Sequence, residues 1–195
     1  EIVAVNWTVQ NRGDVAIRGR LADAVYLSTD GVWDIGDRFV GRIDPPQGRT
    51  LQPGDSYTAS LDFEMPITLP GEYRVLVRTD IFDDVYEGEN NRNNTGFSTG
   101  TISVSVPLLR LDIPLDDQIA AGSARLYQLD TDPGQTVRID LNSLNDTGSH
   151  ELFVRFEDLP SPYEFDAKYE GYLRPDQSLV IPETLGGRYF ILARA

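Results

Sequence analysis

The sequence predicts an all-β protein made of two tandem β-sandwich domains. Apolar and polar residues alternate along most of the chain, as at Val3, Val5 and Trp7, and this period of two is typical of strands. Turn-forming pairs such as Pro53-Gly54 and Pro133-Gly134 interrupt the alternating segments at short intervals. No segment of about ten residues keeps the spacing of an amphipathic helix. A length of 195 residues suits two small domains.

In chain order, the clearest expected strands lie at residues 3–9, 73–77, 102–106 and 189–193. Each of them either alternates or is continuously apolar over a length typical of a strand. The turns expected along the chain are rich in Asn, Asp, Gly and Pro, and they lie at residues 11–14, 45–48, 53–55, 70–71 and 133–134.

A domain boundary is expected near Pro107. Pro107 and Pro114 enclose a short apolar segment, and each proline restricts the backbone around it. We therefore expect a first β-sandwich at residues 1–106, a fairly stiff linker at 107–114 and a second β-sandwich at 115–195.

The composition excludes several classes of function. The net charge of −14 opposes binding to nucleic acid or to an anionic membrane surface, because both need clustered Lys and Arg. The chain has no Cys and a single His, so neither a thiolate site nor an imidazole zinc cluster can form. It has no run of about 18 apolar residues, and we expect no membrane insertion. What remains is oxygen chemistry, above all carboxylates suited to calcium.

The first half resembles the cell-adhesion-related domain found in bacteria (CARDB). The matching segments follow one another in the family's order and lie at residues 9–14, 24–37, 51–57, 70–73, 83–87 and 93–94. The resemblance implies an immunoglobulin-like β-sandwich in an extracellular protein. In that family a strand normally precedes the one that begins at Ile2, so the first domain is expected to lack its first strand.

The second half resembles the bacterial pre-peptidase C-terminal (PPC) domain. Its matching segments lie at residues 127–130, 133–137, 151–156, 159–161, 165–166 and 187–192. The resemblance implies a second, jelly-roll-like β-sandwich of a kind that is often attached to secreted hydrolases or repeated along surface proteins. A further strand usually follows in that family, so the second domain is expected to lack its last strand.

The first candidate calcium site is the loop that carries Asp30, Asp34 and Asp37. Acidic side chains three or four residues apart on a tight loop containing Gly31 can converge on one cation. The alternative is structural: Asp30 and Asp34 bind nearby backbone N–H groups and form turns, while Asp37 is exposed.

A second acidic loop is the candidate supplier of further ligands. It carries Asp83, Glu87 and Glu89, which a sandwich would place at one end of its sheets. Carboxylates at this density repel one another unless they are solvated or bridged by a cation. A solvated turn is the alternative to a calcium ligand set.

These observations predict a non-catalytic structural or adhesion module of a larger bacterial surface or secreted protein, stabilised by calcium if the acidic loops bind it. His150 is the only imidazole, and in a strand its neighbours Ser149 and Glu151 would point to the opposite face from it, so no catalytic triad is expected. Two alternatives stay open: a polysaccharide- or protein-binding accessory module of a secreted hydrolase, and a filament or surface-layer subunit that assembles by strand complementation. The expected partners are neighbouring domains of the same or another chain and extracellular polysaccharide or protein.

Overall fold

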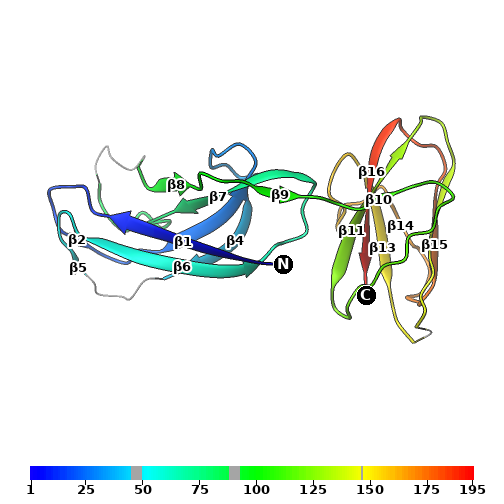
Figure 1. Cartoon of the computed structure of the whole chain (residues 1–195), viewed down its shortest axis with the longest axis horizontal. Coiled ribbons are helices and arrows are strands. Elements are labelled where there is room, and N and C mark those ends of the chain that lie inside the picture. Colours follow the sequence, from blue (N-terminus) through cyan, green and yellow to red (C-terminus); the bar gives the residue numbers. More distant parts are fainter. Residues whose placement is uncertain (45–49, 88–92, 146) are drawn as a thin grey trace. The chain divides into compact units, whose positions relative to one another are not determined.

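The predicted all-β class is confirmed by a computed structural model, which describes residues 1–44, 50–87, 93–145 and 147–195. The regular elements of these residues are strands (Figure 1). The chain divides into two compact units. Unit 1 consists of Glu1–Pro66 and Gly71–Val104, and unit 2 of Ile67–Pro70 and Ser105–Ala195.

The described residues of unit 1 form three sheets. The first pairs two long antiparallel strands, β1 (Ile2–Gln10) and β6 (Ser56–Glu64), along their whole length. The second has the order β4-β3-β7-β8, with β9 also paired to β7. Its strands are β3 (Asp23–Ser28), β4 (Arg38–Ile43), β7 (Gly71–Arg78), β8 (Thr95–Phe97) and β9 (Ile102–Val104). The short strands β2 (Ile17–Arg18) and β5 (Thr50–Leu51) form the third.

The two larger sheets of unit 1 share one apolar core. Val3, Val5 and Trp7 of β1 alternate inward, because successive side chains of a strand point to opposite faces. They pack with Phe63 of β6 against residues of the other sheet, of which Val25, Leu27, Tyr73 and Val75 are buried. The alternation seen in the sequence therefore places one face of β1 in the core and leaves the other exposed.

Unit 2 is built around a five-stranded sheet with the order β10-β11-β16-β13-β14. The strands are β10 (Leu108–Leu109), β11 (Ala124–Thr131), β13 (Glu151–Phe156), β14 (Ala167–Lys168) and β16 (Gly187–Arg194). A second sheet pairs β12 (Val137–Leu141) with β15 (Gln177–Ile181). The predicted linker at 107–114 contains β10, which pairs in parallel with β11.

The central strand β16 is buried on both faces. Tyr189, Ile191 and Ala193 belong to one core cluster, and Phe190 and Leu192 belong to another. This accounts for the continuous apolar run at residues 189–193, since a strand covered on both sides has no exposed face to fill with polar residues.

Candidate functional site

The first acidic loop joins β3 to β4, and its carboxylates close local turns. Asp30 Oδ1 accepts hydrogen bonds from Val32 N at 2.8 Å and from Ser28 Oγ at 3.1 Å. The Val32 N–H, and after it the Ser28 hydroxyl, hold the pKa of Asp30 below its ordinary value. This arrangement is the structural alternative foreseen for the loop.

The carboxylates of the other two acids, Asp34 and Asp37, accept hydrogen bonds from backbone N–H groups of the same turn. Asp34 Oδ1 accepts from Gly36 N at 2.7 Å, and Asp37 Oδ2 accepts from Asp34 N at 3.0 Å. Both are bonds between residues two or three positions apart, so they are set by the local sequence.

The second acidic loop follows β7 and is organised by Asp80, a residue outside the predicted ligand set. Its two carboxylate oxygens accept from Asp84 N and Val85 N, each at 3.0 Å. Burial raises the pKa of Asp80. Asp83 N donates to the Asp80 carbonyl at 2.9 Å. Glu87 Oε2 accepts from Asn94 Nδ2, and Glu89 lies outside the described residues.

Among the residues that the structure describes, no three acidic or imidazole side chains come together in a group that could hold a metal ion. The calcium site at Asp30, Asp34, Asp37, Asp83, Glu87 and Glu89 stays a prediction. The single imidazole lies in unit 2, where His150 Nδ1 is 2.7 Å from the carbonyl oxygen of Pro175.

A buried carboxylate that the sequence analysis missed joins the two sheets of unit 1. Asp23 is fully buried at the start of β3. It accepts hydrogen bonds from Trp7 Nε1 of β1 and Tyr57 OH of β6, both at 2.7 Å, and from Thr79 Oγ1 after β7 at 2.6 Å. Burial, with the neighbouring Asp23 carboxylate, raises the pKa of Tyr57. The only feature of the sequence that could have indicated this buried network is the position of Asp23 inside an apolar stretch.

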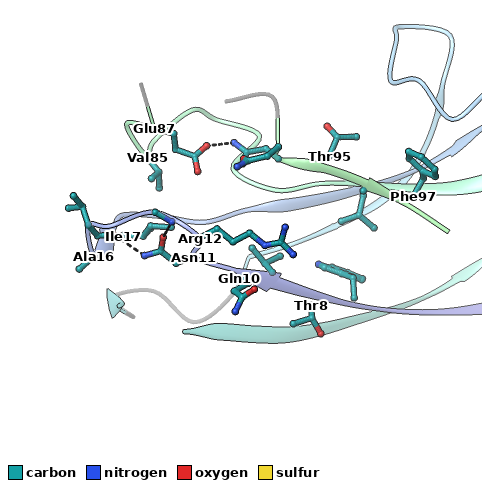
Figure 2. Close-up of a pocket in the computed structure, with 18 of the residues that line it drawn as sticks. Thr8, Gln10, Asn11, Arg12, Ala16, Ile17, Val85, Glu87, Thr95 and Phe97 are labelled. Carbon is teal, nitrogen blue, oxygen red and sulfur yellow. Dashed lines mark hydrogen bonds between the residues drawn. The ribbon is translucent and has the colours of Figure 1, made fainter. Parts of the chain in front are cut away.

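The described residues of unit 1 enclose a groove of about 1100 Å³. Figure 2 shows Thr8, Gln10 and Arg12 together with Thr95 and Phe97 among its lining residues. One wall is the edge of β1 and the segment that follows it, and the other is β8 with its flanking residues. Apolar side chains of β1 and β7 reach its floor, so the groove opens between the two sheets of the unit.

A second surface lies on the outer face of the β4-β3-β7-β8 sheet. The strand register places Phe39, Tyr26, Leu76 and Phe97 in one row across four strands. The Tyr26 ring is 5.7 Å from that of Phe39 and 6.4 Å from that of Trp33, between ring centroids. Trp33, Phe39 and Phe97 are 43%, 55% and 56% exposed.

Two arginines of β7 lie over aromatic rings of this surface. Arg78 Cζ is 3.7 Å from the centroid of the Trp33 ring, and Arg74 Cζ is 5.7 Å from that of Phe97. Both contacts are within the range of cation–π attraction. Among the described residues, neither arginine forms an ion pair within 4.0 Å, the limit that defines such a pair. We call the surface formed by Tyr26, Trp33, Phe39, Arg74, Arg78 and Phe97 the aromatic–arginine face.

Comparisons with known proteins add little. No family model matches the chain, and no curated protein matches it. Among solved structures, the chain is similar to the secreted serine protease VesC from Vibrio cholerae, at 9% identity and a TM-score of 0.33. The match covers 99% of this chain and 43% of VesC. A similarity at that level carries no argument about fold or function.

The described residues contain no helix of the length and apolarity that a membrane span requires.

Proposed function

We propose that this chain is a non-catalytic adhesion module of an extracellular or cell-surface bacterial protein, built from a CARDB-like sandwich and a PPC-like sandwich. The proposal rests on the two family resemblances and on one structural observation, the aromatic–arginine face. Large rings that stay exposed on one sheet face, next to cations that form no ion pair among the described residues, are typical of a binding surface.

The ligand that fits this face best is an acidic polysaccharide. Exposed rings offer flat apolar surfaces against which sugar rings can pack, and Arg guanidinium groups match carboxylates in two-point hydrogen bonds. Arg74 and Arg78 lie on one small face of a chain whose net charge is −14. An anionic polymer is therefore repelled by most of the surface and attracted at this face.

The test is the mobility of the protein in native gels that contain polygalacturonate or alginate. We expect both polymers to retard it and the neutral polymer hydroxyethyl cellulose to leave it unchanged. Because the protein and the acidic polymers have the same sign of charge, retardation cannot arise from simple ion exchange. Unchanged mobility of the wild-type protein in both acidic polymers contradicts the proposed ligand class.

A matched pair of double variants separates this face from exposed aromatic residues in general. Trp33→Ala with Phe97→Ala removes two rings of the face, and we expect affinity to fall about tenfold or more, since each ring contact contributes about 1 kcal/mol. Tyr163→Ala with Tyr172→Ala removes two exposed rings of unit 2 and serves as the control. Equal loss in both double variants would overturn the assignment of the face.

A further inference from the structure

The strand β1 has one edge that no described strand covers. It pairs only with β6, in a two-stranded sheet. Two bonds define which backbone groups face β6: Met65 N donates to Glu1 O, and Asn11 N donates to Asp55 O, each at 2.9 Å. In an antiparallel pair such bonding positions alternate, so the odd-numbered residues of β1 turn their N–H and C=O groups toward β6. The even-numbered residues turn theirs toward the uncovered edge.

This edge lacks the features that usually prevent strands from pairing. From Ile2 to Gln10 the strand contains no charged residue, no Pro and no Gly, and its register with β6 has no bulge. Exposed edges normally carry charges, prolines or bulges that discourage pairing. The other edge of the same sheet, formed by β6, does carry charges. Asp62 and Glu64 lie on β6 and would meet like charges in a paired copy.

The space beside the edge is open. The groove of about 1100 Å³ lies along β1 from Val5 onward, so the outward groups of Asn6 and Thr8 face a hollow rather than packed side chains. The inward residues Val5, Trp7 and Val9 are only half-buried, which leaves apolar surface that a further strand would cover.

We propose that β1 pairs antiparallel with β1 of a second copy, in a two-fold homodimer centred on Asn6. In this register every outward-facing residue has an outward-facing partner: Asn6 faces Asn6, Ala4 faces Thr8, and Ile2 faces Gln10 of the second copy. Self-pairing of one edge gives a closed, isologous interface. The residues beyond the strand ends are complementary in charge. In this register the exposed Arg12 that follows β1 in one copy lies next to Glu1, which precedes β1 in the other copy.

The aromatic–arginine face uses none of the residues of β1, although Phe97 belongs to the face and also lines the groove beside β1. The consequence of the dimer for adhesion is bivalency, since a dimer carries two such faces. The measurement is sedimentation equilibrium of the 195-residue chain over a wide concentration range. We expect the mass to rise from 21.7 kDa toward twice that value. A mass that stays at 21.7 kDa at every concentration overturns the proposal.

A pair of proline variants tests the edge. Thr8→Pro removes an outward N–H from the free edge without removing a bond to β6, and we expect it to abolish the dimer. Thr58→Pro is the matched control, because Thr58 lies opposite Thr8 in the register and turns its N–H to the other edge of the sheet. It is expected to dimerise like the wild type. Loss of the dimer in Thr58→Pro alone, or in neither variant, contradicts the proposed edge.

Charge variants at the two-fold axis test the register even where a proline disturbs folding. Asn6→Lys and Asn6→Asp each place like charges opposite one another, so each alone is expected to be monomeric. Mixing the two brings opposite charges together, and we expect the heterodimer to form. A mixture that stays monomeric, or single variants that dimerise as well as the wild type, overturns the register.

Discussion

The two units hold their sheets together in different ways. In unit 1 the strand β1 is buried on one face, and a polar network around Asp23 ties it to β3, β6 and the end of β7. In unit 2 the strand β16 is buried on both faces and paired on both edges. Unit 1 thus adds a few directional bonds to its apolar core, whereas the central strand of unit 2 is held by continuous apolar packing.

The units also differ in how they treat sheet edges. The five-stranded sheet of unit 2 ends in strands of only two residues, Leu108–Leu109 and Ala167–Lys168. Its second sheet carries the ion pair between Arg138 and Asp140 on β12. Short and charged edges discourage pairing with other chains, whereas the nine-residue uncharged edge of β1 invites it. We therefore propose that unit 1, rather than unit 2, recognises other molecules.

The largest effect is expected from Asp23→Ala. Removal of the carboxylate leaves three donors without their acceptor at a buried site, and we expect unit 1 to lose about 3–5 kcal/mol. Both tryptophans of the chain, Trp7 and Trp33, lie in unit 1, so tryptophan fluorescence in a urea titration reports on that unit. Tyr57→Phe removes a single donor and is expected to cost about 1–2 kcal/mol. Equal stability of Asp23→Ala and wild type would show that the network does not hold the sheets.

The next effect concerns the apolar strand of unit 2. Ile191→Ala removes a side chain that is 1% exposed, and the cavity is expected to cost unit 2 about 2–4 kcal/mol. Val5→Ala is the counterpart in unit 1 and is expected to cost about 1 kcal/mol, because Val5 is only half-buried. Far-ultraviolet circular dichroism follows the strands of both units, whereas tryptophan fluorescence follows unit 1. The loss in Ile191→Ala should therefore appear in the circular dichroism and leave the tryptophan signal unchanged. Similar costs for both variants contradict the contrast between the two strands.

A smaller, pH-dependent effect is expected at Asp30. Its pKa in the folded state is below the ordinary value of 3.8, because the Val32 N–H and the Ser28 hydroxyl favour the charged form. The resulting stabilisation is present above that ordinary value and is lost as the pH falls through the folded-state pKa. We expect the difference in urea midpoint between wild type and Asp30→Ala to be largest at neutral pH and to shrink in acid. Asp30→Asn keeps an acceptor oxygen but has no group that titrates, so its difference from the wild type should be smaller and should also shrink in acid.

A further modest effect is expected from calcium. A weak site with a dissociation constant of about 1 mM would stabilise unit 1 by about 1.4 kcal/mol at about 10 mM calcium. The measurement is thermal unfolding in calcium against chelator, followed by tryptophan fluorescence. Asp34→Asn with Asp37→Asn should remove the difference. Identical melting temperatures of the wild type in both buffers contradict the calcium prediction.

Much of the fold follows from local sequence. The alternation at residues 3–9 lies within β1, that at 73–77 lies within β7, and the apolar run at 189–193 lies within β16. The turn at Pro53-Gly54 is equally local, because Gly54 has a φ of +86° that favours glycine, and Asp55 N donates to Gln52 O at 2.9 Å. The hydrogen bonds of Asp30 and Asp34 also span only two residues, which explains why turn formation was foreseeable there.

The sequence by itself determined the strand class, the turns and the local carboxylate bonds, because these depend on side-chain period and on neighbours a few residues apart. Tertiary structure decided the rest. Phe39, Tyr26 and Phe97 share a row only through strand register, and Asp23 meets Trp7 and Tyr57 only when two sheets face each other. The uncovered edge of β1 likewise depends on which strands pair. Contacts between residues distant in sequence carry no local pattern, so the surfaces that we propose for binding became visible only in the folded chain.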